Sequence, residues 1–559
     1  MSGLINRAAD MLRRNLMASA IGAVLVAFVQ PYAGAVATNM MEKGRQSINL
    51  FDFLTAAEIA NAKAGVKADL TAKIQSALNA GVGKRLVINA GKFGLSYVGW
   101  GTNGMALDVP SNIVIEFEPG AWFESMAHNA TIYQMLRVWD RSNVTIIRPN
   151  MDGRKDLNAA VAGEFGMAID IRGGNNVHVV KPVTRNCWGD GVYIGLSAFT
   201  GSPENITIDH HFADGCRRQG MSITAGVNVH VRNPVWQNIA GTAPAAGLDI
   251  EPDDNSAELR GIRIYNPKTK NCTTGIQIQL NRMTGATPKE VDIKITGHLD
   301  EGSVVGYAVN GADTSLGVNK LSGKIVSSGP VYIRNGASAF LSSEYDALGP
   351  RIVVERPTVI DCNRNALASP KYAAPFTVLR DTGSLKTYAI GGVEIIEPTV
   401  IMRTGSVPRL FSFQDVVNGA AAVRDCHFID PVKLEGLTDV RGNFQGSGST
   451  SDRYRVWAYA IAGSGTLDFN FSGPVSAPNT AIVLTLDTAT YIAGAPDVII
   501  RVPFGASCQV ATQAGGNFVG QVAGKKYQAL NAAGSYLRLR PLGAGVFLVI
   551  EMVGQWTVV

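Results

Sequence analysis

The residues Met167-Ala-Ile-Asp-Ile171 form a short stretch in which apolar side chains recur at every second position towards its end. A period of two is typical of a β-strand, because successive side chains point to opposite faces. The same pattern recurs in Val192-Tyr-Ile194, Met221-Ser-Ile223, Leu248-Asp-Ile250 and Ile276-Gln-Ile278. We expect the apolar residues to face a core and the residues between them to face outward.

The outward positions of these strands form a regularly spaced series. Its members, separated by 23, 29, 27 and 28 residues, are Asp170, Tyr193, Ser222, Asp249 and Gln277. A period of this size indicates one coil of a solenoid per step. The sequence therefore predicts strands stacked in register, with these side chains in one outward column. A β-sandwich with accidental spacing is the alternative.

A second type of strand lies between the first. Each member begins with a turn-like residue, alternates apolar residues over about four positions and ends at a proline, which has no donor for a strand ladder. The members are Asn143–Asn150, Asn176–Pro182, Asn228–Pro234, Gly261–Pro267, Arg351–Pro357 and Gly392–Pro398. Together the two types predict an all-β fold of stacked coils between about residues 101 and 440.

Length and composition agree with a fold that grows lengthwise. The chain has 559 residues, of which 61 are glycine and 17% are charged, with a net charge of +5. Its ordinary apolar content excludes wholesale disorder, and no excess of helix-forming residues indicates a coiled coil. Without a block of Lys and Arg, nucleic acid is not expected as a partner.

The regions on either side of the repeat differ from it. Residues 54–100 begin with a helical pattern in which Ile74, Ala77 and Leu78 share one face, and Asp69 or Thr71 is placed to cap the helix. The segment Val87-Ile-Asn-Ala-Gly-Lys-Phe93 follows. This order resembles the N-terminal cap of the pectate-lyase-like, right-handed parallel β-helix superfamily. Residues 441–559 lack the proline-terminated repeat and are expected to form a β-sandwich-like domain.

Residues 1–53 allow two interpretations. Arg13 and Arg14 precede an apolar core, Ala18–Val29, and a small-residue end at Ala35-Val-Ala37, as in a secretory signal. The core is shorter than the roughly 20 residues that span a bilayer, so no membrane span is expected. The segments Gly22–Phe28, Gly34–Ala37, Lys43–Arg45 and Ser47–Phe53 also resemble, in order, the N-terminal linker of phage tailspikes. A signal peptide does not explain the match as far as Phe53, so the linker is favoured.

Three motifs in successive coils carry the most specific resemblance. They are Asn186-Cys-Trp-Gly-Asp-Gly-Val-Tyr193, Cys216-Arg-Arg-Gln-Gly-Met-Ser-Ile223 and Gly241-Thr-Ala-Pro-Ala-Ala-Gly-Leu-Asp-Ile-Glu-Pro252. They resemble the β-helix of phage tailspike depolymerases, and the resemblance extends over about residues 18–435. It does not identify the sugar, since such proteins share a fold more than a specificity.

The resemblance implies several properties. The protein would be a homotrimeric virion spike, assembled in the host cytoplasm, that binds and cleaves a polysaccharide at the bacterial cell surface. Residues 1–53 would attach it to a phage tail or baseplate protein. Residues 441–559 would serve trimerisation or carbohydrate binding.

Glycoside hydrolysis needs two carboxyl groups, about 5–5.5 Å apart for retention or 6.5–9.5 Å apart for inversion. Asp249 and Glu251 lie two positions apart on one strand, so both face outward with stems about 6.6 Å apart. Asp190 lies two coils below Asp249, a distance of about 10 Å, and is the third catalytic candidate. Asp170, three coils below and about 14 Å away, is too far for a direct pair.

Further side chains are candidates for binding the substrate. Arg217 and Arg218 are suited to hold a sugar carboxylate, or to keep one acid ionised. The other candidates are Tyr193, Trp188, Asp170 and Gln277. No cofactor or metal is expected. The six cysteines are scattered without a CxxC pair and are predicted to be buried apolar residues, and adjacent His210 and His211 point to opposite faces of a strand.

Three other functions remain open. A polysaccharide lyase on the same fold would use a base such as Tyr193 and cations such as Arg217 and Arg218 to neutralise a uronate. A receptor-binding spike would grip the sugar without cleaving it. A secreted pectinase-like enzyme would require cleavage of residues 1–37. The acidic outward column favours hydrolysis.

Overall fold

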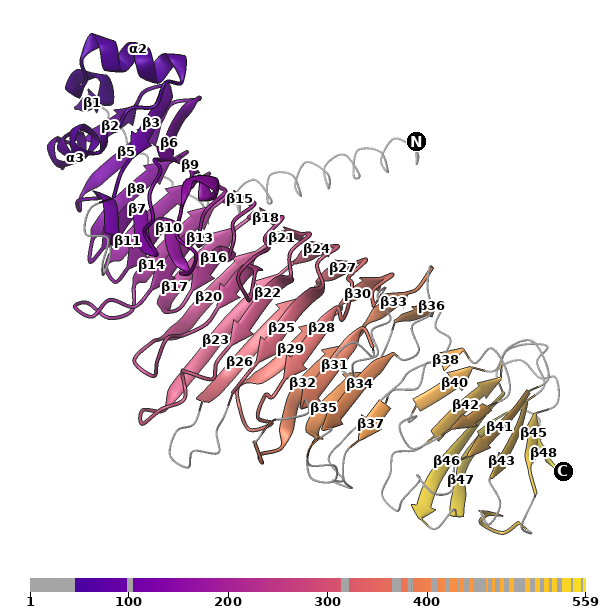
Figure 1. The fold of residues 1–559 in the computed structure, drawn as a ribbon. Helices are drawn as coiled ribbons and strands as arrows, with labels where there is room; N and C mark the ends of the chain where they lie inside the picture. Colours follow the sequence, from indigo (N-terminus) through magenta and orange to yellow (C-terminus); the bar gives the residue numbers. More distant parts are fainter. Residues whose placement is uncertain are drawn as a thin grey trace, which may run out of the picture.

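The computed structural model describes residues 46–97, 104–312, 321–363 and 374–380, and shorter segments between 384 and 559. Their regular secondary structure is nearly all β-strand (Figure 1). Helices α2 (Ala56–Ala64) and α3 (Thr71–Ala80) lie at the N-terminal end of the stack. The parallel β-helix expected from the repeat is confirmed.

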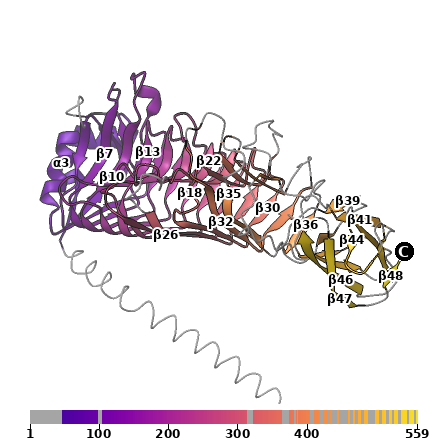
Figure 2. The same ribbon diagram turned by 90° about the horizontal axis from the view of Figure 1, so that it is seen from below.

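Three parallel sheets run along the solenoid. In the described part of the chain, sheet A has 13 strands and sheets B and C have 12 each. Each full coil gives one strand to each sheet in turn, so the molecule is a long stack, seen from the side in Figure 1 and from below in Figure 2. Sheet A runs from β1 (Ser47–Asn49) to β35 (Val423–Ile429), sheet B from β3 (Gly91–Leu95) to β36 (Lys433–Glu435), and sheet C from β4 (Gly104–Asp108) to β37 (Asn443–Gln445).

The proline-terminated strands all belong to sheet A. They are β8 (Ser142–Ile147), β11 (Asn175–Val180), β17 (Gly226–Arg232), β20 (Leu259–Tyr265), β29 (Arg351–Glu355) and β32 (Ile390–Ile396). Asparagine occurs near the start of several of these strands, at positions where the backbone is left-handed. Examples are Asn143 (φ 57°) and Asn176 (φ 59°). The Asn176 amide also donates to the Asn143 side-chain oxygen at 2.8 Å, which links neighbouring coils.

The second strand type forms sheet C. The strands that build the site are β7 (Ile132–Trp139), β10 (Phe165–Arg172), β13 (Asp190–Gly195), β16 (Gln219–Ile223), β19 (Ala246–Ile250), β22 (Thr274–Gln279), β25 (Val305–Asn310) and β28 (Phe340–Ser343). Their apolar residues, such as Val192, Ile194, Leu248 and Ile250, lie in one continuous core, as the alternation predicted.

A column of glycines precedes these apolar residues in sheet C. A Cβ atom on Gly247 would lie only 2.6 Å from the Gly275 oxygen and 2.6 Å from Cγ2 of Thr269 in sheet B. The register is the same on both sides of the glycine, since Asp190 pairs with Gln219 and Val192 with Met221. The glycine in each coil therefore marks a position at which side chains of sheet B lie against bare backbone, leaving no room for a Cβ atom.

The core also contains a polar cluster around Asp300 of β24 (Leu299–Glu301). The Asp300 carboxylate accepts hydrogen bonds of 2.6 Å from the Thr269 hydroxyl, the Ser303 hydroxyl and the Asn335 amide. Burial raises the pKa of Asp300 to about 6, although these donors oppose the shift. The three donors satisfy an acid that would otherwise be costly to bury.

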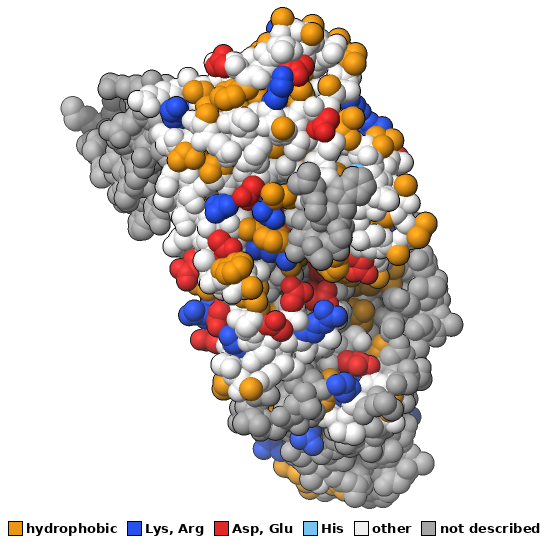
Figure 3. All heavy atoms as spheres, turned by 60° about the vertical axis from the view of Figure 1, so that its left-hand side comes forward, with side chains coloured by type: hydrophobic (Ala, Val, Ile, Leu, Met, Phe, Trp, Pro, Cys, Tyr) orange, Lys and Arg blue, Asp and Glu red, His pale blue; other side chains and the backbone are white. Residues whose placement is uncertain are grey.

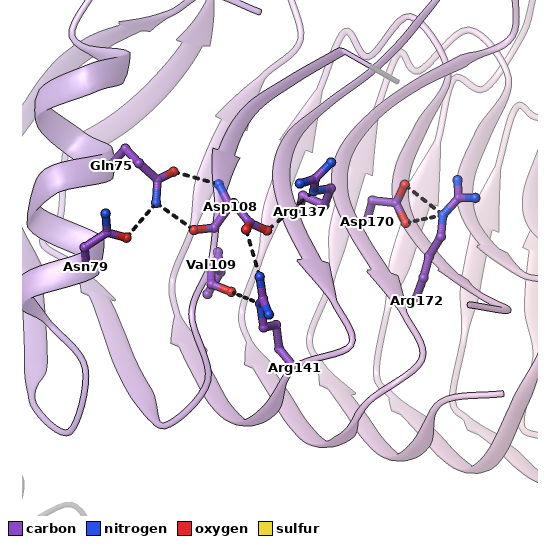
Figure 4. A network of polar contacts seen from close by, with 8 residues as sticks. All are labelled: Gln75, Asn79, Asp108, Val109, Arg137, Arg141, Asp170 and Arg172. Carbon is purple, nitrogen blue, oxygen red and sulfur yellow. Dashed lines mark hydrogen bonds and ion pairs between the residues drawn. The ribbon is translucent and has the colours of Figure 1, made fainter. Parts of the chain in front are cut away.

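The N-terminal cap closes the first strand of sheet C (Figure 4). Gln75 of α3 donates to the Asp108 carbonyl at 2.9 Å and accepts from the Asp108 backbone N–H at 2.8 Å. Arg141 and Arg137 contact the Asp108 carboxylate at 2.8 and 3.4 Å. The predicted apolar face of α3 is buried, and Asp69 accepts hydrogen bonds from Thr71 at the start of this helix.

Two further sheets lie in the C-terminal region. Within the described residues they have six and five strands. Unlike the solenoid they include antiparallel pairs, such as β46 (Ser535–Gly543) with β47 (Val546–Val553). This agrees with the β-sandwich-like fold class expected for the C-terminal part, while the bounds 441–559 stay a prediction, since β37 still belongs to sheet C.

Candidate active site on the outer face of sheet C

The outward column predicted from the spacing exists in sheet C. Asp170 pairs with Tyr193, Tyr193 with Ser222, Ser222 with Asp249, and Asp249 with Gln277, one coil per step. Leu248 and Ile250, on either side of Asp249, belong to the core, so Asp249 points out of the solenoid. Glu251 comes directly after the last residue of β19, not within the strand as expected. It is half-buried, and its charge acts on Asp249.

Three of the acids on this face are buried. Asp170 and Asp190 are fully buried and Asp249 is only 1% exposed, although their strand positions face outward. Longer side chains from neighbouring coils cover them, because stacked coils are only about 4.8 Å apart. A buried carboxyl loses hydration and therefore holds its proton to a higher pH.

Asp249 lies between two carboxamides. The amide nitrogen of Gln219 is 2.9 Å from Oδ2, and that of Gln277 is 3.5 Å from Oδ1. Burial raises the pKa of Asp249 well above its usual value, and repulsion from Glu251 adds to this, while Arg218 opposes it. Asp249 is thus set up as a proton donor beside the more accessible Glu251.

Asp190, two coils below, is the third acid of the group. Its Oδ2 atom accepts hydrogen bonds from the Ser222 hydroxyl at 2.8 Å and from Arg218 at 3.2 Å. Burial raises its pKa to about 6, against the opposing charge of Arg218. Within the described residues, Oε1 of Gln219 is buried without a hydrogen-bond partner, so a substrate could use it as an acceptor only if the covering side chains move.

Arg218 is the cation that links the acids. Besides Asp190 it lies 3.6 Å from the exposed Glu164. Burial lowers its pKa, but the carboxylates of Asp190, Asp249 and others outweigh that effect, and the net shift is upward. Arg218 therefore stays charged and limits the repulsion within the acidic group.

Asp170 and Tyr193 belong to a neighbouring cluster around Arg172. The Arg172 guanidinium binds Asp170 at 3.0 Å (Figure 4) and lies 4.6 Å from the Tyr193 ring centroid. The Tyr193 hydroxyl contacts Thr224 at 2.9 Å and donates to Asp253 at 3.1 Å. Burial raises the pKa of Tyr193, which makes it a poor base at neutral pH.

Arg217 and Trp188 are engaged with each other. The Arg217 guanidinium lies 3.8 Å from the Trp188 ring centroid, and its Nε donates to the Trp188 carbonyl at 2.8 Å. Further bonds reach Thr242 and the Gly163 carbonyl, so this pair ties loops of adjacent coils together. A contact of either residue with substrate stays a prediction.

A hollow of about 480 Å³ continues the site towards the C-terminus, and most of its lining residues were not predicted. Of the candidates only Gln277 lines it. Gln279, two positions later on the same face, and its neighbours Asn310 and Ser343 in the next coils are new. Extending the outward column by two positions in each strand would have found them.

Other elements of the chain offer few alternatives to this site. Cys187, Cys216, Cys272, Cys362 and Cys426 are buried free thiols, as predicted, while the side chain of Cys508 lies outside the described residues. No group of three or more His, Cys, Asp or Glu residues within the described residues is arranged to hold a metal ion. No helix in that part of the chain has the length and apolarity needed to cross a membrane.

On the face shown in Figure 3, acidic and basic side chains lie side by side along the middle of the molecule. On the outer face of sheet C, Asp249, Glu251, Asp190 and Arg218 form one group around a proton-holding acid. Asp170 with Arg172 is a second, because burial raises the pKa of Asp170 as well, but it contains one acid where the first contains three. The arrangement of the first group suits acid–base chemistry at a glycosidic bond.

No protein-family model matches the sequence, and no curated protein matches it. Solved structures of similar fold include the A-module of mannuronan C-5 epimerase AlgE4 of Azotobacter vinelandii, at 15% identity and a TM-score of 0.49, covering 73% of this chain and 100% of that chain. The catalytic unit of a GH87 α-1,3-glucanase of Streptomyces thermodiastaticus is 15% identical, with a TM-score of 0.45 and coverage of 73% and 69%.

The pre-mature gene product 12 of bacteriophage phi29 is 14% identical, with a TM-score of 0.48 and coverage of 81% and 66%. At these identities the similarity concerns the fold alone.

Proposed function

We propose that the chain is a phage tailspike-type depolymerase that hydrolyses glycosidic bonds of a bacterial surface polysaccharide. The observation that carries this is the pair formed by Asp249, a buried acid with a strongly raised pKa, and the half-buried Glu251, which follows two positions later and acts on that pKa. Two carboxyl groups in different environments are what such hydrolysis requires.

In the proposed reaction, Asp249 protonates the glycosidic oxygen of the leaving group, and Glu251 acts as nucleophile or as the base that activates water. For extended backbone the stems of residues two positions apart are about 6.6 Å apart, and side-chain rotamers would decide between retention and inversion. Because Asp249 is 1% exposed, the covering side chains of Gln219, Gln277 and Glu251 must move when a sugar binds. Arg218 and Asp190 position and tune the pair.

The phage role rests on the sequence resemblance. We infer that residues 1–53 attach the protein to a tail or baseplate protein, that residues 54–100 cap the β-helix, and that residues 101–440 carry the sugar groove. Residues 441–559 would serve trimerisation or carbohydrate binding in a homotrimer on the virion, acting at the bacterial surface. Light scattering of the full chain tests the trimer, which a monomeric mass would contradict.

One assay separates the possible activities. The purified full chain is incubated with a panel of bacterial capsular, lipopolysaccharide and exopolysaccharide preparations. We expect new reducing ends without ultraviolet-absorbing unsaturated sugars. Unsaturated products would mean a lyase, and retention of a polysaccharide without cleavage would mean a receptor-binding spike.

The pH dependence of kcat/KM is a further prediction. Because Asp249 must be protonated and its pKa is raised, activity is expected to persist above the ordinary aspartate pKa and to fall as pH rises through the raised value. The negative charge of Asp190 helps to raise that pKa, so Asp190→Asn should move the alkaline limb of the profile to lower pH. If the alkaline limb of the profile is the same in Asp190→Asn and wild type, Asp190 does not influence the protonation of Asp249.

A further inference from the structure

The hollow beside the acids has an unusual lining. Along the outer face of β22, β25 and β28, carboxamides and a hydroxyl follow one another in register, since Gln279 pairs with Asn310 and Asn310 with Ser343. Gln277 and Asn281 add two more carboxamides to the lining. Asn310 Oδ1 accepts from the Ser343 backbone N–H at 3.2 Å and Gln279 Oε1 from the Gln277 amide at 3.5 Å. Each oxygen has a second lone pair and each amide nitrogen two N–H groups, which suit neighbouring sugar hydroxyls.

The floor of the hollow is apolar. Val305, Ala308 and Leu341 line it, and together with Ala337 they form a small hydrophobic cluster apart from the main core of the solenoid. All four are at most 8% exposed. Apolar side chains beside hydrogen-bonding groups suit a pyranose ring, whose C–H faces can pack on the apolar residues while its hydroxyls hydrogen-bond the polar ones.

Charge in the hollow is sparse. In the described lining, Glu344 and Lys386 are the charged residues, and they carry opposite signs. No arginine lines it there, in contrast to the acid cluster, where Arg218 is present. A uronate or other anionic sugar would lose hydration in such a lining and gain little binding energy from opposite charges. A neutral sugar has no charge to desolvate.

The hollow is continuous with the catalytic pair. Gln277 lines the hollow and also places its amide nitrogen 3.5 Å from the Asp249 carboxylate in the coil below. If a polysaccharide lies along the stack with the bond to be cleaved at Asp249, the sugar next to that bond, towards the C-terminal coils of the protein, would occupy the hollow.

From these contacts we propose that the hollow is a subsite for an uncharged pyranose of the polysaccharide, held by Gln279 and Asn310 over the floor of Val305, Ala308 and Leu341. The inference rests on the proposed function for the identity of the polymer, and it adds that the sugar next to the cleaved bond is neutral.

The test uses the full chain on an array of bacterial polysaccharide fragments, some with and some without uronic acids. Wild type should retain fragments with neutral residues. Gln279→Ala and Asn310→Ala should bind these at least 10-fold more weakly, while Gln237→Ala, a matched carboxamide on the outside of sheet B, should bind as wild type. Wild-type affinity in both hollow variants, or retention of uronate-only fragments alone, overturns the proposal.

A second variant separates this proposal from hydrolysis. Asp249→Asn should retain the same fragments without cleaving them. If wild type cleaves nothing and the Gln279 and Asn310 variants still lose binding, the subsite stands and the hydrolytic function fails. If wild type cleaves a polymer and these variants bind and cleave it as well as wild type, hydrolysis stands and the subsite fails.

Discussion

Replacing Asp249 with asparagine is expected to lower kcat by about 10²- to 10⁴-fold, the range that a positioned general acid contributes. The substitution keeps the size of the side chain but removes the proton that is held beside Glu251. KM should change little, because the introduced carboxamide still faces Gln219 and Gln277. Initial rates of reducing-end release on the cleaved polymer measure the effect.

Asp292→Asn is the matched control for this prediction. Asp292 lies on sheet A, where it pairs with Arg263 at 2.6 Å, and its side chain is 46% exposed. Its substitution should leave the rate unchanged. Full activity in Asp249→Asn, together with full activity in Glu251→Gln, would mean that cleavage occurs elsewhere.

Replacing Asp300 with alanine is expected to destabilise the solenoid by about 3 kcal/mol. The change leaves the Thr269, Ser303 and Asn335 donors without this buried acceptor and opens a cavity among them. The loss should appear as a lower midpoint in thermal unfolding followed by circular dichroism. Asp292→Ala, which breaks an exposed pair, should cost less than about 1 kcal/mol.

The same residue predicts a pH effect on stability. The folded pKa of Asp300, about 6, lies above that of an unfolded aspartate, so the folded state binds more protons between the two values. This stabilisation is present below the unfolded pKa and is lost as pH rises through 6. The wild-type melting midpoint should therefore fall between pH 4 and pH 7 by more than that of Asp300→Ala.

The spacing of short motifs was enough to predict the coil register. Asp170, Tyr193, Ser222, Asp249 and Gln277 pair as the sequence intervals required, because every coil must return to the same face. The glycines of the same motifs were visible in the sequence, but their role was not. Gly247 matters because Thr269 approaches it from another sheet, and that contact is distant in sequence.

The burial of the acids could not be predicted from alternation. A period of two tells which face Asp249 occupies, but not that side chains one coil away cover it. The ion pair between Arg218 and Asp190 could not be predicted either, since the long arginine side chain can reach acids in either of two neighbouring coils. The hollow depends on three strands at once, so Asn310 and Ser343 became visible only when the coils were stacked.

The bond between Gln75 and Asp108 has a consequence for how large the protein can become. In a stack of similar coils the terminal strand of each sheet has unpaired backbone N–H and C=O groups. These groups can pair with a strand of another chain. The Gln75 side chain hydrogen-bonds both the N–H and the carbonyl of Asp108, as a neighbouring strand would. A rod built on the same repeat but lacking this stopper would be prone to join end to end into fibres.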